Sequence, residues 1–366
     1  MQRIIYCLSS HHIGLTSLLT NYAISLHKLA PDQFCFVCGE KEQFEGLFER
    51  LKMESISPRI IRGFDDHKDM RRLIADFKLL VQEHKPDLVH VQTNWQLAIA
   101  AAVKLLVKHK YRIAYTIHGY RHNQMLCSIA ARAIIGLSLL SFADAVFAPS
   151  GFLKDKFSFL GNKIRLLHLG VDDDFFKAAG ALGFLSPKRL FFAGQFRLGK
   201  NQDWLIRAVH CYIEKTGDNA IELYLPGEGD RKPSCMDLAA SLGIAANVLF
   251  PGQLNRQEIV TLLSKCQFAI VPTNRETFGH CIAEPAVMGR VIITRPVGVA
   301  PDFIVDGENG FYFDSEKDLF DVLGKVLSDG PLCLRIAEKI RASSDLFSWD
   351  RICKDYLEII SCSWDA

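Results

Sequence analysis

The sequence lacks several features that would assign it at once to a class of protein. No apolar run reaches the roughly 18 residues of a membrane-spanning helix; the longest, IIGLSLLSFA, is closed by Asp144. The N-terminal residues show no signal-peptide pattern, since IIYCL is short and polar residues follow it. The net charge is only +2, so the overall charge gives no argument for binding nucleic acid. We therefore expect a cytoplasmic chain without a nucleic-acid partner.

The chain also lacks the cysteine pattern of a disulfide-stabilised protein. Its eleven cysteines are scattered and odd in number, which fits a reduced cytosol. Cys35 and Cys38 form a C-x-x-C pair, but QFCFVCGE reads as a strand, on which residues three apart point to opposite faces. We predict that both thiols are core residues. No His/Cys/Asp cluster has the spacing of metal ligands, so we expect no metal.

What the chain does contain is a long alternation of short apolar runs with helical patterns. RIIYCL, QFCFVCG and DLVHVQ are separated by helical stretches, and a second series begins with RLFFAG. This alternation predicts parallel sheets covered by helices on both faces. The pattern lapses in AAGALGFLSPKR, which indicates a linker. We predict an α/β fold of two Rossmann-like, doubly wound domains facing a cleft: residues 1–171, a linker at 172–187, and residues 188–345.

Residues 101–170 carry a local excess of basic side chains. Ten lysines and arginines stand against two aspartates in this segment, among apolar helical stretches such as WQLAIAAAVKLLVKH. This pattern fits either an ordinary solvated face or a surface that attracts anionic lipid. The basic residues are Lys104, Lys108, Lys110, Arg112, Arg121, Arg132, Lys154, Lys156, Lys163 and Arg165.

The stretch FAIVPTNRETFGHCIAEPAVMG reads as strand, loop and helix, with two glutamates eight positions apart. A helix start offers free N–H groups and a partial positive charge, and Gly279 permits close approach of an anion. We predict that a phosphate binds there, with Glu284 accepting hydrogen bonds from a sugar attached to it and Glu276 on the loop across the anion. The alternative is that both glutamates are ordinary helix charges.

A second strand end, FFAGQFRLGKNQDWLIRA, combines Gly194 with the basic residues Arg197 and Lys200 before a helix. A basic, glycine-bearing turn of this kind can hold a diphosphate. Taken alone, the pattern is weak and fits a solvated surface turn better.

Together and in this order, these segments resemble the retaining, nucleotide-sugar-dependent glycosyltransferases of the GT-B fold. This is the group 1, glycosyltransferase family 4-like type that carries a Glu-x7-Glu motif. The similarity is collinear over nearly the whole chain. Other matching segments are SSHHIGLTSLLTNYAISL, PDLVHVQ, YTIHGY, FADAVFAPSGFLKDKF, KIRLLHLGVD, LYLPGEGD and VLFPGQL.

The resemblance implies roles for the residues of the second domain. Lys200 and the backbone N–H groups near Phe278 and Gly279 would hold the donor diphosphate. Glu284 would accept from the ribose hydroxyls, and Glu276 would border the donor sugar.

The resemblance also assigns residues outside this motif. Gly14 corresponds to the first-loop glycine that faces the diphosphate, and His118 to the histidine near the reacting carbon, although a histidine at a strand end can be purely structural. The loop with Gly252 and Leu254 would border the nucleobase. Gln195 stands where the family often has arginine, so Arg197 is the candidate to supply that charge.

The implied activity is the transfer of a hexose-like sugar from a nucleoside diphosphate to an acceptor hydroxyl, with retention at the anomeric carbon. The acceptor would be a glycan or a lipid-linked precursor of a surface polysaccharide such as lipopolysaccharide. We expect no cofactor, because Lys200, Arg197 and a helix terminus meet the charge of the diphosphate. FSWDRICKDYLEII resembles the family's final helices, so residues 346–366 should pack back on the first domain. A peripheral position on the inner face of the membrane follows as an expectation.

Two alternatives remain open. One is a nucleotide-sugar epimerase on the same fold, and the other is a non-catalytic paralogue that binds a nucleotide sugar. A dehydrogenase fits less well, because PGEGD lacks the third glycine of the dinucleotide fingerprint.

Overall fold

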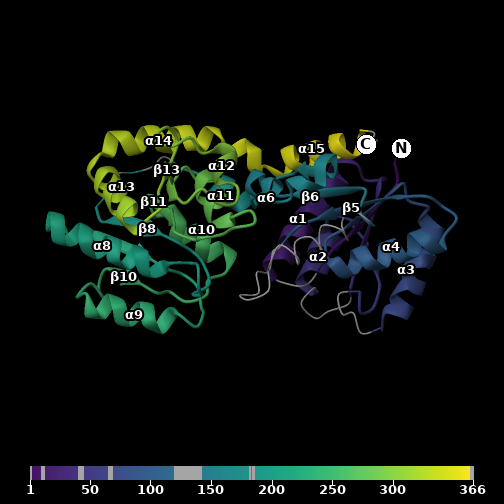
Figure 1. Ribbon diagram of the computed structural model, residues 1–366, viewed down its shortest axis with the longest axis horizontal. Coiled ribbons are helices and arrows are strands. Elements are labelled where there is room, and N and C mark those ends of the chain that lie inside the picture. The colour runs from purple at the N-terminus through teal and green to yellow at the C-terminus, as the bar shows by residue number, and fades with distance from the viewer. Residues whose placement is uncertain are drawn as a thin grey trace. The chain divides into compact units, whose positions relative to one another are not determined.

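The computed structural model describes the chain as two compact α/β units. It describes residues 2–9, 13–39, 45–64, 69–118, 142–180, 183 and 186–362. Unit 1 comprises Met1–Gly170 with Trp349–Ala366, and unit 2 comprises Val171–Ser348. Figure 1 shows that helices cover the sheet of each unit, as expected for doubly wound folds.

Unit 1 is built on a parallel sheet with the strand order β3-β2-β1-β4-β5-β6-β7. Its strands are β1 (Ile4–Cys7), β2 (Phe34–Cys38), β3 (Arg59–Ile60), β4 (Leu88–Val91), β5 (Arg112–Thr116), β6 (Ala145–Ala148) and β7 (Ile164–Leu166). Its helices are α1 (Ile13–Leu29), α2 (Glu45–Met53), α3 (Met70–His84), α4 (Asn94–Leu106), α6 (Gly151–Lys156) and α15 (Trp349–Ser361). None of the helices that the structure describes is long and apolar enough to cross a bilayer.

The sheet of unit 1 separates two apolar cores because alternate residues of each strand face opposite sides. Ile5 lies in one core and Tyr6 in the other. Cys35 packs against the first core, whereas Cys38 belongs to the second. Both cysteines are free thiols. The prediction that the C-x-x-C thiols point to opposite faces is therefore confirmed.

Helix α15 completes the second core of unit 1. Its buried face includes Trp349, Tyr356 and Ile360. The Tyr356 hydroxyl lies 2.9 Å from Nδ1 of the buried His90. A Cβ atom on Gly170 would come within 2.3 Å of the Trp349 ring, so only glycine allows the chain to leave unit 1 beside this tryptophan.

Unit 2 is built on a second parallel sheet with the order β10-β9-β8-β11-β12-β13. Its strands are β8 (Lys188–Phe191), β9 (Ile221–Tyr224), β10 (Val248–Leu249), β11 (Phe268–Val271), β12 (Val291–Thr294) and β13 (Phe311–Tyr312). Its helices are α7 (Asp173–Lys177), α8 (Gln202–Thr216), α9 (Lys232–Ser241), α10 (Arg256–Ser264), α11 (His280–Val287), α12 (Ala300–Phe303), α13 (Glu316–Ser328) and α14 (Gly330–Ala342).

The ends of unit 2 differ from the predicted domain limits. The described residues of the segment 172–187, which was expected as a linker, belong to the unit and contain helix α7, which is capped by Asp172 and packs against α10 and α11. The Asp172 carboxylate also pairs with the Arg256 guanidinium. Phe347, expected in the C-terminal segment of unit 1, packs on Phe278 and Phe303 of unit 2. These contacts bring both segments into unit 2.

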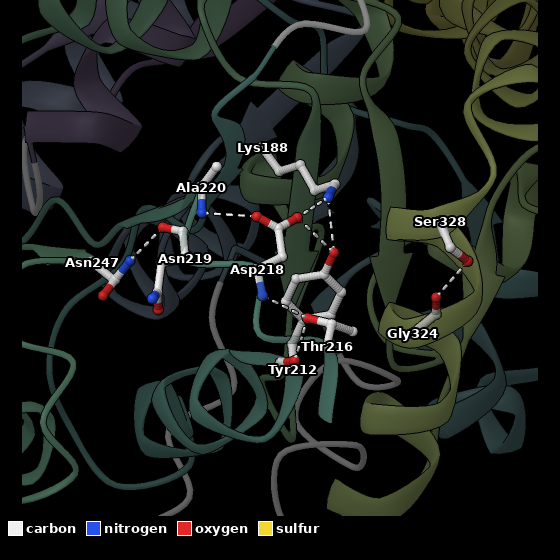
Figure 2. A network of polar contacts seen from close by, with 9 residues as sticks. All are labelled: Lys188, Tyr212, Thr216, Asp218, Asn219, Ala220, Asn247, Gly324 and Ser328. Carbon is white, nitrogen blue, oxygen red and sulfur yellow. Dashed lines mark hydrogen bonds and ion pairs between the residues drawn. The ribbon is translucent and has the colours of Figure 1, made fainter. Parts of the chain in front are cut away.

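A polar network fixes the start of β8, at the amino edge of the unit 2 sheet (Figure 2). Lys188 Nζ donates to Asp218 Oδ2 at 2.5 Å and to the Tyr212 hydroxyl at 2.8 Å. Asp218 Oδ1 accepts from the backbone N–H of Ala220 at 2.9 Å. The network thus joins the C-terminal end of α8 to the first residue of β8. Because Lys188 lies at the amino edge, far from the carboxyl ends of the strands, it is a suitable control for substitutions at the carboxyl edge.

Candidate functional site

The candidate site of unit 2 begins where the strand order reverses. Strands β8 and β11 are neighbours, and the chain passes from β8 through β9 and β10 on one side before it returns to β11 on the other. Ligands of open α/β sheets bind at the carboxyl ends of strands at such a switch point. The loops after β8 and β11 carry Lys200 and Glu276, respectively.

Hydrogen bonds hold these two loops together. The N–H of Asn274 donates to the Gly199 carbonyl at 2.8 Å, and the Thr273 hydroxyl donates to the same carbonyl at 3.3 Å. In the other direction, the Asn201 side chain donates to the Pro272 carbonyl at 2.8 Å. The position of Lys200 is therefore fixed relative to the loop that bears Glu276.

Lys200 and Glu276 form an ion pair in which Lys200 Nζ donates to Glu276 Oε1. Only 12% of the Lys200 side chain and 17% of the Glu276 side chain are exposed. A charge this poorly hydrated is costly to leave without a partner. An anion that binds Lys200 must therefore compete with Glu276 for the ammonium group, or join it.

Helix α11 presents its N-terminus beside this pair. Gly279 occupies the N-cap position with φ of 98°, and no side chain caps the helix. Phe278 is buried, and its carbonyl accepts from the N–H of Val299 at 2.6 Å. Among the residues that the structure describes, no side chain caps this N-terminus, so the first N–H groups of the helix can meet an anion, whereas the N–H of Ile282 donates to the Gly279 carbonyl at 2.8 Å.

The loop that carries Lys200 lies directly against the loop after β9. Gly227 and Gly229 have φ values of 140° and 152°, and a Cβ atom on them would come within 2.2 Å of the carbonyl oxygens of Gly194 and Phe196, respectively. The N–H of Phe196 donates to the Glu228 carbonyl at 2.9 Å. The two glycines of LPGEGD therefore allow this close approach. Neither glycine was among the predicted site residues.

The other predicted donor residues lie along the same carboxyl edge. Gln195 and Arg197 are exposed, and Arg197 has no ion pair within the residues that the structure describes. Gly252 follows β10 with φ of 82°, and its carbonyl accepts from the N–H of Gly227 at 2.7 Å. Leu254 is half-buried two residues farther on. The loops after β8, β9 and β10 thus form one continuous edge.

Glu284 lies one turn into α11, on the same face as His280. His280 Nδ1 is 3.8 Å from Glu284 Oε1. Burial raises the pKa of Glu284 to about 8; nearby Arg256 opposes this rise and Asp172 adds to it. Burial lowers the pKa of His280 to about 4, and Arg256 lowers it further. The contact of His280 with Glu284 was not predicted, although the i,i+4 spacing on a helix was the available signal.

The raised pKa of Glu284 leads to a pH-dependent stability. The folded pKa of about 8 lies above the ordinary carboxyl value, so the folded state retains a proton that the unfolded state releases. The contribution of Glu284 to the free energy of unfolding is therefore fully present below the pKa of the unfolded state and is lost as the pH rises to about 8. We expect the melting temperature of Glu284→Gln to exceed that of the wild type by a margin that grows between pH 5 and pH 8.5. A difference in melting temperature that does not change with pH would contradict the raised pKa of Glu284.

Unit 1 places its predicted residues at the carboxyl edge of its own sheet. Gly14 lies in the first turn of α1, which follows β1, and His118 lies two residues beyond β5. His118 is partly buried, with Nε2 at 2.5 Å from Gln92 Oε1. Burial lowers the pKa of His118 to about 4.

Within the ranges that the structure describes, no group of three or more His, Cys, Asp or Glu side chains is arranged to hold a metal ion. Lys200 lies near the α11 N-terminus through its pair with Glu276, and Arg256 is close enough to affect the pKa of His280 and Glu284 on this helix.

Family models match both units. Residues 178–343 match the model described as Glycosyl transferases group 1, and residues 33–175 match that of Glycosyltransferase Family 4. The two matches together cover most of the chain, one in each unit.

Similar proteins support this family match. The chain is 27% identical over 190 residues to the D-inositol 3-phosphate glycosyltransferase of Corynebacterium urealyticum, covering 50% of this chain and 45% of the relative. The chain thus spans somewhat under half the length of this relative. HepE of Anabaena, crystallised with UDP and glucose, has a TM-score of 0.76 at 18% identity and covers 99% of this chain and 100% of its own. The lipopolysaccharide outer core galactosyltransferase WaaB has a TM-score of 0.72 at 15% identity, with 98% and 99% covered.

Proposed function

Because this chain belongs to the group 1 and family 4 glycosyltransferases and has the GT-B fold, we propose that it transfers a sugar from a nucleoside diphosphate to an acceptor hydroxyl with retention. The observation that carries this proposal is the arrangement at the β8/β11 switch point. There Lys200, Glu276 and the uncapped N-terminus of α11 occupy one edge of the sheet. A cation and free N–H groups suit a diphosphate, and a carboxylate beside them suits an electron-poor sugar carbon.

The proposed mechanism relies on electrostatic stabilisation. The donor diphosphate binds Lys200 and the first turn of α11, while the exposed Arg197 adds positive charge. As the bond between sugar and phosphate breaks, negative charge grows on the diphosphate next to these groups. The Glu276 carboxylate stabilises the positive charge that develops on the sugar, and the departing phosphate accepts the proton of the acceptor hydroxyl. His118 of unit 1 is the further proposed catalytic residue.

A panel of nucleotide sugars tests donor binding. A ligand that binds only the folded state raises its stability by RT ln(1 + [L]/Kd), so the true donor should raise the melting temperature most. HepE was crystallised with UDP and glucose, which makes UDP-sugars the first candidates. Lys200→Met should abolish the shift. A panel in which no nucleotide sugar shifts the wild-type melting temperature would contradict the proposal.

We expect transfer to continue in EDTA. The charge of the leaving diphosphate is met by Lys200, Arg197 and the α11 N-terminus, so a divalent cation is not needed for its stabilisation. Initial rates with and without EDTA should agree within about twofold after prior dialysis against chelator. A strict requirement for added magnesium or manganese would contradict this expectation.

The acceptor is proposed to be a glycan carried on a lipid, met at an anionic membrane surface. Helix α4 exposes Trp95, Leu105 and Leu106, with Leu105 85% exposed, and Lys108 follows the helix. Two of the predicted basic residues have partners within the unit: Lys104 pairs with Asp144 at 2.8 Å, and Arg112, which keeps its charge, donates to the carbonyls of Ile360 and Cys362. Arg121 and Arg132 lie outside the described residues. The name of WaaB as a lipopolysaccharide enzyme supports an acceptor of this class.

Vesicle sedimentation tests this surface. Each basic residue near an anionic surface contributes about 1 kcal/mol to the free energy of membrane binding, and salt screens this attraction. We expect the full chain to bind vesicles of phosphatidylglycerol more tightly than neutral ones, with the difference reduced at high salt. Leu105→Glu should lower this binding about tenfold, while Leu334→Glu, also at an exposed apolar position but in unit 2, should not. Equal binding of the wild type to both vesicle types would count against membrane docking.

An epimerase would bind the nucleotide sugar at the same carboxyl edge of the unit 2 sheet but would require no acceptor. Product analysis separates the two activities: a transferase forms a glycosylated acceptor, whereas an epimerase changes the nucleotide sugar when the acceptor is absent.

A further inference from the structure

A set of hydrogen bonds outside the Lys200–Glu276 pair connects the loops after β8, β11 and β12. Arg295 directly follows β12, and its Nη1 donates to Asn274 Oδ1 on the loop after β11. The same Oδ1 accepts from Asn201 Nδ2 at 2.9 Å, and Asn201 directly follows Lys200. None of these three residues was among the predicted site residues.

The orientation of both asparagine amides is determined by their partners. A guanidinium can only donate hydrogen bonds, so the atom of Asn274 that faces Arg295 is the amide oxygen. A backbone carbonyl can only accept, so the atom of Asn201 that lies 2.8 Å from the Pro272 carbonyl is the amide nitrogen. One oxygen of Asn274 therefore receives two donors, one from each neighbouring loop.

The turn that carries Lys200 has a backbone that needs support. Gly199 and Asn201, on either side of Lys200, have φ of 86° and 54°. Glycine adopts this left-handed region readily and asparagine tolerates it, but such a conformation persists only where surrounding contacts hold it. The Gly199 carbonyl accepts from the N–H of Asn274 and from the Thr273 hydroxyl. The loop after β11 thus supports the turn from both the backbone and the side chains.

The guanidinium of Arg295 has a cost for the fold. Its Nε is buried without a hydrogen-bond partner in the part of the chain that the structure describes. A buried donor without a partner lowers the stability of the folded state, which favours a role for this group beyond stability. Its Cζ lies 6.0 Å from the centre of the Trp204 ring on α8, so the guanidinium stays beside the helix that follows the Lys200 turn.

We propose that Arg295 is a positioning residue that, through Asn274, fixes the turn presenting Lys200 to the donor diphosphate. This deepens the proposed function and rests on it for the identity of the ligand. All of these residues belong to unit 2, so the arrangement is complete within that unit. The bonds of the turn to Asn274 do not involve the Lys200 side chain, so the turn keeps its place when the ammonium group turns from Glu276 to the diphosphate.

Hydrogen exchange on the full chain without any donor tests the effect on the turn. Arg295→Met removes the hydrogen-bond donors, so peptides that contain Lys200 or Asn274 should exchange at least about threefold faster than in the wild type. Arg207→Met is the matched control, since Arg207 is also a half-buried arginine of unit 2 and pairs with Asp203 and Glu316. It should leave exchange at the turn unchanged. Wild-type exchange in Arg295→Met, or equal acceleration in both variants, would overturn the proposal and leave the proposed transferase function intact.

A double-mutant cycle with Lys200→Met tests the link to the diphosphate. Arg295→Met alone should lower kcat/KM by about three- to tenfold. Arg295→Lys, which keeps a donor, should recover most of this loss. If Arg295 acts through Lys200, adding Arg295→Met to Lys200→Met should lower kcat/KM by less than about twofold. An equal loss in both backgrounds would overturn the proposal, whereas a wild type that transfers no sugar from any nucleotide donor would contradict the proposed function.

Discussion

Replacing Lys200 with methionine should lower kcat/KM for sugar transfer by about 10²–10³-fold, the loss that accompanies removal of one group stabilising a transition-state charge. Methionine keeps the length of the side chain and removes its charge. The lysine sits 12% exposed between the β8 and β11 loops, where its interaction with a diphosphate is screened little by water. The effect should appear in both kcat and donor affinity, because the diphosphate is anionic before the reaction and becomes more so during it.

Lys188→Met is the matched control for this change. Lys188 also forms an ion pair in unit 2, with Asp218, but lies at the amino edge of the sheet (Figure 2). The control should lose some stability and keep its kcat/KM within about twofold of the wild type. Equal losses of activity in both variants would show that Lys200 acts through stability and not through the donor.

Glu276→Gln should mainly lower turnover, whereas Glu284→Ala should mainly weaken donor binding. Glu276 is proposed to face the positive charge that develops on the sugar, so Glu276→Gln should lower kcat by about ten- to a hundredfold. Its donor affinity should stay constant or rise, because Glu276 no longer competes with the diphosphate for Lys200. Glu284 is proposed to bind the ribose before and during the reaction, so Glu284→Ala should weaken donor binding by about ten- to a hundredfold, the equivalent of about 1.5–3 kcal/mol.

Isothermal titration with the donor and steady-state kinetics on both variants separate these roles. If Glu276→Gln keeps full turnover, Glu276 does not take part in the reaction. If Glu284→Ala keeps the donor affinity of the wild type, Glu284 does not bind the ribose. Glu258→Ala is a suitable control, since this glutamate caps α10 and has no proposed contact with the donor. Its donor affinity and turnover should remain those of the wild type.

The alternating pattern of apolar runs was sufficient to predict two parallel-sheet units, because buried parallel strands and amphipathic helices leave distinct periodicities. It was also sufficient to place Lys200 and Glu276 at strand ends. Their direct contact could not be predicted, because it depends on β8 and β11 being neighbours, and strand order is not encoded in local periodicity. The motif resemblance suggested one ligand for both residues but not an ion pair between them.

Other features escaped prediction for different physical reasons. Gly227 and Gly229 are required by the backbone of another loop, which no local pattern reveals. Helix α7 has only the five residues DDFFK, too few for a helical periodicity, and its contacts with α10 and α11 are tertiary. Gln92 is an uncharged residue at the end of β4, and its contact with His118 beyond β5 depends on the pairing of these two strands.

The stereochemistry of the first product is the most direct test of the central claim. The purified chain, its donor from the thermal-shift panel and an acceptor should be followed by proton NMR from the first minutes of reaction. A glycosylated acceptor with the same anomeric configuration as the donor is the predicted result, and Lys200→Met should form it at least about a hundredfold more slowly. A product of inverted configuration, or an altered nucleotide sugar formed equally fast without acceptor, would contradict the proposal of a retaining glycosyltransferase.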